Sequence, residues 1–414
     1  MIVRRRAHGR RWQRSLFPWL KEFGFTQVSS DSSVFTISRD VETPNGKRTE
    51  HLHIGVYVDD LAIVYGQDDK HSLYHSFVTA LTKKWNVEDE GDVHDLLGIE
   101  FDTEEEGFIT LHQRSYIEKL AADFFPDGVP ASCQANKPPC DHTLPLLVVE
   151  AMSQPPPDGK HPDVRRYQSL VGALLYCSGN TRPDVAFAVG LLCRAMSRPT
   201  PELYNAGLRV LGYLYRSRYI GLRYGLDTKP LAGQCDSDWG VRHSTSGWQF
   251  SYSQAVVSWG SKKQTSVALS SCEAEIMAAS EAAKEAIFLG RFLTELGHGS
   301  SDPIQMGMDN QAAIAISYNP EMHARTKHID RRHFFVRECV ENMQLRVPFV
   351  KTVDNLADFF TKPLPKTQFY KMRDALMNVP PRLRMPPVVA ECTACGDLGT
   401  VKGEPCYVCS PEPA

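Results

Sequence analysis

The chain has 414 residues, a length that predicts about two to four domains. With 42% hydrophobic and 23% charged residues, its composition is that of a soluble globular protein and excludes wholesale disorder, collagen and a coiled coil. Its 46 basic and 49 acidic residues give a net charge of −3, so any binding of nucleic acid must come from local basic patches.

The apolar stretches, of which 185–193 is an example, are far shorter than the roughly 18 residues of a membrane span. The Arg-rich N-terminus lacks the apolar segment that would make it a secretory signal. We therefore expect an intracellular protein, cytoplasmic or nuclear, that is not secreted and has no membrane partner.

The first 130 residues predict alternating helices and strands. We expect a helix that ends at Gly24, strands over 34–38, 53–58 and 61–65, a helix over 72–85, a strand pair over 95–102 and 107–112, and a short helix over 116–125. Asp59 and Asp60 form the tight turn of one hairpin. Two adjacent carboxylates at a hairpin tip suit metal-assisted nucleotidyl transfer; an ordinary Asp-Asp turn would have the same sequence.

Three proline-rich stretches, 136–145, 153–163 and 379–387, predict linkers or loops. Proline lacks a backbone donor and disfavours helix at the residue before it. After the second stretch, apolar spacing predicts helices over 167–177, 183–196 and 203–215. The middle of the chain is therefore expected to be mostly helical.

The next segment alternates strands and helices, which predicts a mixed α/β sheet with helices packed on it. The expected elements are strands over 232–236, 247–251 and 256–259, a helix over 271–296, a strand over 304–308, a helix from Gln311, a basic helix over 325–340, a strand over 345–350 and a helix that starts within 355–361.

Four acids of this segment lie at the ends of elements. Asp236 and Asp309 end strands, and Asp358 lies at the start of the last expected helix; strand ends are where α/β sheets place functional side chains. Glu273 follows a serine by three residues, the pattern of a capping box. That leaves Glu275, at the edge of the apolar stripe of the long helix, as the better catalytic candidate.

Four converging carboxylates would repel one another and need cations. Hard divalent metals, Mg²⁺ or Mn²⁺, fit oxygen ligands best, and two such ions can activate a water and stabilise the leaving oxygen of a phosphodiester. The spacing alone fits ordinary surface acids and helix caps equally well.

The motifs of this segment resemble the ribonuclease H domain of copia-type retrotransposon polyproteins. They are CDSDW at 235–239, STSG at 244–247, SWGSKKQ at 258–264, EAE at 273–275, DNQ at 309–311, RTKHI at 325–329 and LADFFTKPL at 356–364. The resemblance implies that Asp236, Glu275, Asp309 and Asp358 bind the metals, with Asp238 as the nearest rival of Asp236.

Earlier segments resemble the copia-type reverse transcriptase. They are 55–65, 96–101 (where the family places its primer grip), 116–120, 167–172 and 181–196. The resemblance implies that Asp59 and Asp60 bind Mg²⁺ in a polymerase palm. Reverse transcriptases place another metal-binding Asp on an earlier palm strand, and the chain starts too late to contain that Asp or the fingers. We therefore expect no RNA-directed DNA polymerase activity from this chain alone.

A run of basic residues has two interpretations: a solvated helix face, or a surface that tracks the phosphates of an RNA–DNA hybrid. The candidate nucleic-acid-binding residues are Lys262, Lys263, Arg325, Lys327, His328, Arg331 and Arg332.

The tail carries two CxxC pairs, Cys392 with Cys395 and Cys406 with Cys409, and glycines lie between them. Two thiolate pairs on turns that glycine permits suit tetrahedral Zn²⁺; reactive or incidental cysteines are the alternative. The family resemblance ends near Leu364 and does not explain this tail, which could bind nucleic acid or a protein.

These patterns imply an α/β (α+β) chain in four parts. Residues 1–130 are a partial polymerase palm with the start of the thumb, and 131–227 a linker and helical connection. Residues 228–372 form a ribonuclease H-like mixed five-stranded sheet with flanking helices, and 373–414 a proline-rich linker with a small zinc-knuckle-like tail of four cysteines.

The expected function is two-metal-ion hydrolysis of RNA in RNA–DNA hybrids, with the remaining polyprotein segments as further partners. A catalytically inactive nucleic-acid-binding relic is the alternative.

Overall fold

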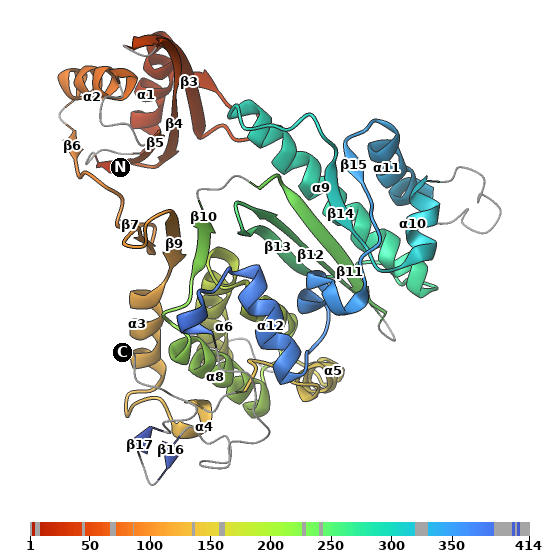
Figure 1. Cartoon of the computed structure of the whole chain (residues 1–414). Helices are drawn as coiled ribbons and strands as arrows, with labels where there is room; N and C mark the ends of the chain where they lie inside the picture. Colours follow the sequence, from red (N-terminus) through yellow and green to blue (C-terminus); the bar gives the residue numbers. More distant parts are fainter. Residues whose placement is uncertain are drawn as a thin grey trace. The chain divides into compact units, whose positions relative to one another are not determined.

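The computed structural model describes residues 2–4, 9–43, 46–66, 72–85, 87–134, 137–156, 162–225, 229–239, 243–318, 330–384, 400–401 and 404–405 (Figure 1). The chain forms two compact units: unit 1 comprises Met1–Leu97 and Ile287–Ser301, and unit 2 comprises Gly98–Ala286 and Asp302–Ala414. No helix among these described ranges has both the length and the hydrophobicity that a membrane crossing requires.

Unit 1 is built on a six-stranded sheet in the order β2-β3-β4-β5-β1-β6. Its strands are β1 (Ile2–Arg4), β2 (Thr26–Gln27), β3 (Val34–Thr43), β4 (Gly46–Tyr57), β5 (Asp60–Tyr65) and β6 (Glu88–Asp89), and the short strand β7 (Asp95–Leu96) follows. Helices α1 (Gly9–Phe23) and α2 (Ser72–Lys84) share one apolar core with β3, β4 and β5. The predicted end of the first helix is confirmed: Gly24 has a φ of +117°, and the Phe25 amide donates to the Leu20 carbonyl at 2.9 Å.

The hairpin of β4 and β5 has a different turn from the predicted one. Tyr57 and Asp60 are paired residues of the two strands, so the turn consists of Val58 and Asp59, and Asp60 begins β5. Val58 has a φ of +51°. Two-residue hairpin loops need a positive φ to match the twist of their strands, and here a β-branched residue supplies it.

In unit 2, strands β8 (Ile99–Asp102), β9 (Phe108–His112) and β10 (Leu222–Gly225) are consecutive neighbours in an antiparallel sheet. The helical part comprises α3 (Arg114–Phe124), α4 (Ala131–Gln134), α5 (Thr143–Ser153), α6 (Pro162–Asn180), η1 (Pro183–Val185), α7 (Ala186–Arg194) and α8 (Pro201–Arg216). The mostly helical middle segment is thus confirmed. Helix α5 was not predicted, because it begins within one proline-rich stretch expected to be a loop and ends at the start of the next; it buries Leu144, Val148 and Ala151.

The predicted mixed sheet of unit 2 is confirmed, with five strands in the order β13-β12-β11-β14-β15. Strands β11 (Ala232–Asp238), β12 (Thr245–Tyr252) and β13 (Ala255–Lys263) are antiparallel neighbours. Strand β14 (Ile304–Gly307) pairs in parallel with β11, and β15 (Leu345–Arg346) pairs in parallel with β14. The accompanying helices are α9 (Ser271–Glu295), of which Ser271–Ala286 belongs to unit 2, α10 (Gln311–Tyr318) and α11 (Asp330–Glu341).

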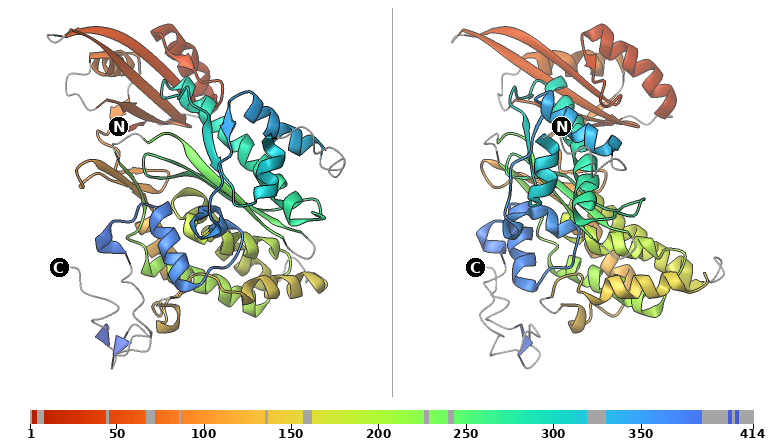
Figure 2. Two further views of the ribbon diagram at one scale, coloured as in Figure 1. Left: turned by 45° about the vertical axis from the view of Figure 1, so that its right-hand side comes forward. Right: turned by 90° about the vertical axis from the view of Figure 1, so that its right-hand side faces the viewer.

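The end of this unit corrects the expected last helix. In place of a helix from Asn355 there are two 3₁₀ turns, η3 (Thr352–Asp354) and η4 (Leu356–Phe360), before α12 (Lys366–Leu376) and a last turn, η5 (Pro381–Leu383). Pro363 and Pro365 explain the break, because neither can donate the amide hydrogen bond that a continuing helix needs. η4 packs on β11 and β12, and α7 and α12 pack on β13 (Figure 2).

A single apolar core of unit 2 extends from Ile117 to Val379 and includes side chains of α3, the middle helices, β13, η4 and α12. The sheet that carries the acids and the helical segment before it are therefore packed as one body. The short strands β16 (Thr400–Val401) and β17 (Glu404–Pro405) pair with each other. The functional boundaries at 130, 227 and 372 stay predictions.

Candidate functional site

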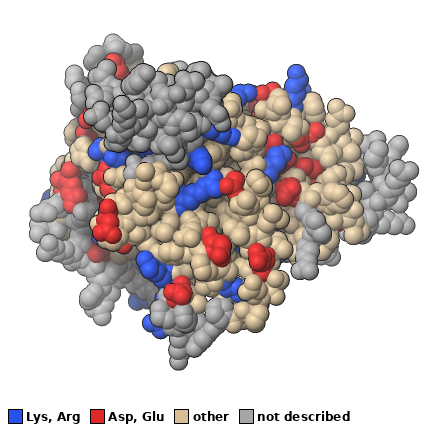
Figure 3. All heavy atoms as spheres, turned by 90° about the horizontal axis from the view of Figure 1, so that it is seen from below, with Lys and Arg blue, Asp and Glu red and all other residues tan. Residues whose placement is uncertain are grey.

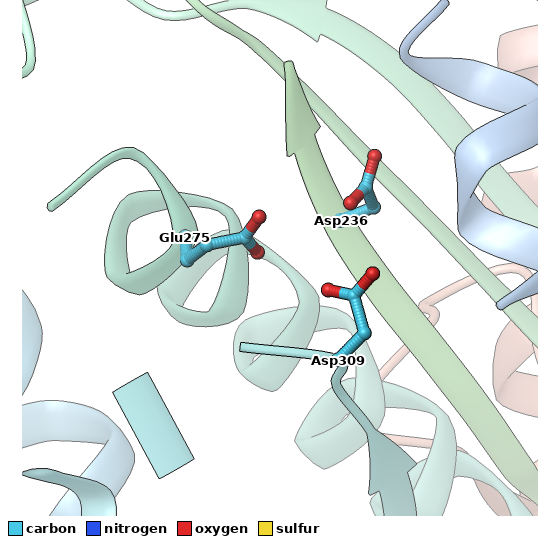
Figure 4. A group of neighbouring side chains, drawn as sticks. All are labelled: Asp236, Glu275 and Asp309. Atoms are coloured by element: carbon cyan, nitrogen blue, oxygen red, sulfur yellow. The ribbon is translucent and has the colours of Figure 1, made fainter. Parts of the chain in front are cut away.

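Three carboxylates meet at one edge of the five-stranded sheet. Asp236 comes from β11, Glu275 from the first turns of α9 and Asp309 from the residues after β14, and the three side chains point toward one another (Figure 4). Ligand atoms of the three all lie within 4.8 Å of one another. Across the part of the chain that the structure describes, no other group of three His, Cys, Asp or Glu side chains is arranged in this way.

Strand pairing accounts for this convergence. β11 and β14 are parallel neighbours, so their carboxyl ends, which carry Asp236 and Asp309, meet at the same sheet edge. Helix α9 reaches this edge through a contact with the strand, because the Ser237 amide donates to Oε1 of Glu275 at 3.4 Å.

The capping prediction for Glu273 is confirmed by two hydrogen bonds. The Glu273 amide donates to Oγ of Ser270 at 3.1 Å, and Oε2 of Glu273 accepts from the Leu269 amide at 2.6 Å. The carboxylate thus binds backbone just before the helix. Glu275, two residues later, is the one of the two that joins the acidic group.

The fourth predicted acid, Asp358, lies on η4 and is 1% exposed. It is not part of the group of three. Burial and the negative charge of Asp236 raise its pKa to about 7, although the Lys362 ammonium, 2.8 Å from Oδ1, opposes this shift. Asp358 thus lies near Asp236. The rival, Asp238, is exposed and lies outside the group of three.

The electrostatics of the group fit a divalent cation. Burial, reinforced by the charges of Asp236 and Asp309, raises the pKa of Glu275 to about 9. Oε2 of Glu275 is buried and has no hydrogen-bond partner, an arrangement that costs free energy unless a ligand satisfies the oxygen. Carboxylate oxygens are the ligands that Mg²⁺ and Mn²⁺ prefer, so these residues suit such an ion.

Two residues of the motif LADFFTKPL for which the sequence predicted no role contact the acids. Thr361 is fully buried and donates from Oγ1 to Oδ2 of Asp236 at 2.5 Å, and Lys362 forms the ion pair with Asp358. Lys362 follows Asp358 by four residues, the spacing of an i,i+4 ion pair, which was an available signal. The contact between Thr361 and Asp236 joins residues 125 positions apart, and no local spacing predicts it.

The polymerase-type acids lie in unit 1 at the β4–β5 hairpin. Asp59 is in the turn, and its Oδ1 is buried without a hydrogen-bond partner. Asp60 is the first residue of β5 and pairs with Tyr57. In the described ranges, no third acidic or metal-binding side chain joins these two in a compact group.

The structure describes only part of the predicted nucleic-acid surface. Lys262 forms an ion pair with Glu281 at 3.3 Å, and Lys263 is exposed at the end of β13. Arg325, Lys327 and His328 lie outside the described residues, as do the side chains of Arg331 and Arg332 on α11. On the face in Figure 3, basic and acidic side chains are interspersed.

The four tail cysteines, Cys392, Cys395, Cys406 and Cys409, also lie outside the described residues. The other seven cysteines are free thiols, of which Cys140, Cys177, Cys235 and Cys339 are buried.

Comparison with known proteins identifies the family. Residues 4–129 match the family model described as reverse transcriptase (RNA-dependent DNA polymerase). The putative transposon Ty5-1 protein of Saccharomyces cerevisiae is 31% identical over 280 residues, which are 66% of this chain and 84% of that protein. The chain belongs to the copia-type retrotransposon Pol family. The resemblance predicted from the motifs is thereby confirmed.

Another member of this family, the retrovirus-related Pol polyprotein from transposon TNT 1-94 of Nicotiana tabacum, is 33% identical over 372 residues. The match covers 87% of this chain and 26% of that polyprotein, so the chain spans about a quarter of its length. Among solved structures, a foamy viral protease-reverse transcriptase in complex with double-stranded DNA is similar, with a TM-score of 0.43 and 12% identity over 72% of this chain and 46% of that one.

Proposed function

We propose that this chain is a reverse transcriptase/ribonuclease H part of a retrotransposon Pol protein and that its unit 2 hydrolyses RNA in RNA–DNA hybrids. The convergence of Asp236, Glu275 and Asp309 at the edge of a mixed five-stranded sheet carries the proposal. Membership in the Pol family supports it.

In this proposal Asp236, Glu275 and Asp309 hold Mg²⁺ or Mn²⁺, with Asp358 beside them. When bound, such ions supply Lewis-acid and electrostatic assistance to phosphodiester hydrolysis. The chain's own residues keep the carboxylates in place: the Ser237 amide holds Glu275, and the Lys362 ammonium holds Asp358. Asp236, Glu275 and Asp358 are buried and Asp309 is half-buried, so the charges of the group interact more strongly than they would in bulk water.

The test is cleavage of a labelled RNA–DNA hybrid by the purified full chain with and without Mg²⁺. We expect Mg²⁺-dependent cleavage that Asp309→Asn abolishes. Asp123→Asn, which makes the same chemical change on the exposed side of α3, serves as the matched control and should keep full activity. Equal cleavage by wild type and Asp309→Asn would refute the assignment. Hybrid binding without metal-dependent cleavage would favour the inactive nucleic-acid-binding alternative.

Two further assignments rest on sequence. We propose that Asp59 and Asp60 are the metal-binding acids of a polymerase hairpin, and that this chain alone extends no primer. We also propose that the four tail cysteines bind Zn²⁺. Primer extension by the purified chain would contradict the statement that this chain alone extends no primer. Absence of zinc from protein purified without a chelator would contradict the zinc proposal.

A further inference from the structure

The geometry points to Thr361 as a positioning residue that orients the carboxylate of Asp236 through its hydroxyl group. This inference rests on the proposed function, because it concerns the same acidic site. Thr361 lies directly after η4 and is fully buried, and its Oγ1 donates to Oδ2 of Asp236 at 2.5 Å.

The hydroxyl has one proton and two acceptors within reach. Besides Asp236, the carbonyl oxygen of Asp358 lies 3.2 Å from Oγ1. A carboxylate is the stronger acceptor, and the shorter of the two distances leads to it, so the proton goes to Asp236. One carboxylate oxygen of Asp236 is thereby held in a buried hydrogen bond, and the carboxylate can rotate only by breaking it.

The methyl group of Thr361 is fixed as well. Gly247 on β12 is the residue directly opposite Asp236 in the strand register. A Cβ at Gly247 would lie 2.6 Å from Cγ2 of Thr361 and 2.9 Å from the carbonyl oxygen of Ala357. Only glycine therefore allows η4 to come this close to the sheet at the level of Asp236.

These contacts set the side-chain rotamer of Thr361. With the methyl group packed over Gly247, the hydroxyl is directed at Asp236 instead of rotating freely. The same close approach of η4 brings Asp358 near Asp236. Groups that hydrogen-bond a ligating carboxylate fix its orientation, and their loss costs about 10- to 100-fold in metal affinity or activity.

The experiment compares Thr361→Val with Thr361→Ser in the full chain. Valine keeps the methyl group over Gly247 and the side-chain volume but removes the hydroxyl, whereas serine keeps the hydroxyl. Mn²⁺ binding is measured by electron paramagnetic resonance, and hybrid cleavage is measured against Mg²⁺ concentration. We expect Thr361→Val to bind Mn²⁺ about 10- to 100-fold more weakly than wild type and to need correspondingly more Mg²⁺ for cleavage. Thr361→Ser should keep the wild-type Mn²⁺ affinity and the wild-type Mg²⁺ requirement.

A second pair keeps the inference testable if the valine variant does not fold. Thr361→Ala and Thr361→Ser differ only in the hydroxyl, so the alanine variant should show the weaker metal binding of the two. Equal Mn²⁺ affinity within either pair, or wild-type protein that binds no Mn²⁺, would overturn the role of Thr361. Wild-type protein that binds Mn²⁺ with the expected difference between variants but does not cleave hybrids would leave the role intact and refute the proposed function.

Discussion

Glu273 and Glu275 lie two residues apart in the first turns of α9, and their carboxylates have different partners. Oε2 of Glu273 accepts from the Leu269 amide, whereas the carboxylate of Glu275 faces Asp236 and Asp309. One carboxylate thus caps a helix and the other belongs to the acidic group. The pair makes a matched test of the candidate site within one helical turn.

Glu275→Gln should remove hybrid cleavage, with a loss of about 100-fold or more, because a charged ligand at the reacting centre contributes several kcal/mol. Glu273→Gln should leave cleavage unchanged, since glutamine can make the same bond to the Leu269 amide in a capping box. Initial rates of both variants in Mg²⁺ provide the measurement. Comparable losses in the two variants would mean that Glu275 has no special role.

Glu50 makes the stability of unit 1 depend on pH. Burial alone would raise its pKa, but hydrogen bonds from the Leu73 amide, from Arg48 and from the Ser72 hydroxyl and amide lower it to about 2. Since the folded-state pKa is depressed, the ionised form stabilises the fold above pH 4.5. This stabilisation is lost as the pH falls from about 4.5 to about 2.

Glu50→Gln should therefore destabilise unit 1 at pH 7 and have little effect near pH 2. Hydrogen exchange of the α2 amides reports on the loss, because the Glu50 carboxylate binds the first amides of that helix. His75→Gln, on the same helix and exposed, is the control. A difference between wild type and Glu50→Gln that persists unchanged at acid pH would show that the carboxylate charge is not the cause.

Val58 holds a strained backbone conformation in the β4–β5 turn. Its φ is +51° and the residue is 47% exposed, so the valine gains little packing in this conformation. A left-handed conformation raises the free energy of a non-glycine residue by about 1–2 kcal/mol. Glycine avoids this strain, but the greater conformational entropy that it loses on folding offsets about half of the gain. Val58→Gly should stabilise the protein by about 0.5–1 kcal/mol in urea unfolding.

Val58→Thr is the control for this change. Threonine is also β-branched, so the strain should remain and stability should change little. Destabilisation by Val58→Gly would mean that the valine side chain supports the turn instead of straining it.

A buried ion pair joins the helices of unit 2. Arg182 and Asp184 are 0% and 1% exposed in their side chains and lie 2.7 Å apart. The Tyr213 hydroxyl also donates to Asp184, and Arg182 donates to Ser217. Removing Arg182 leaves Asp184 buried without its ion-pair partner, with only the Tyr213 hydroxyl and the weaker effect of the Arg373 charge, so Arg182→Met should cost about 3–5 kcal/mol.

The double variant Arg182→Met/Asp184→Leu should lose less than the sum of the two single variants, because no unpaired charge remains. The measurement is the free energy of urea unfolding of wild type, Arg182→Met, Asp184→Leu and the double variant, which together form a double-mutant cycle. Additive losses would show that the two side chains contribute independently.

Several local features followed from the sequence, because neighbouring residues determine them. Helix α9 spans Ser271–Glu295, against the predicted 271–296, since its apolar stripe and its capping box are both local signals. The end of α1 at Gly24 also follows from a local signal, because glycine readily adopts the positive φ found there. The order of strands and helices in the acidic segment also followed from alternation along the chain.

Other features depended on contacts that local patterns do not contain. The hairpin turn is Val58–Asp59 because strand pairing between Tyr57 and Asp60 decides the register. This pairing gives Val58 a positive φ, although that conformation is unfavourable for a β-branched residue. Asp358 lies on a 3₁₀ turn because η4 packs closely over Gly247, and the prolines after it prevent a longer helix.

The sequence by itself determined the family, the residue types of the candidate site and the elements that carry them, because motifs and periodicity are written in the order of residues. From the spacing alone, the acids could equally be metal ligands or ordinary surface residues and helix caps. Only the tertiary structure decided that Asp236, Glu275 and Asp309 meet, since parallel pairing of β11 with β14 brings distant strand ends to one edge. The same packing placed the Thr361 hydroxyl on Asp236, a contact that exists only because η4 folds back onto the sheet.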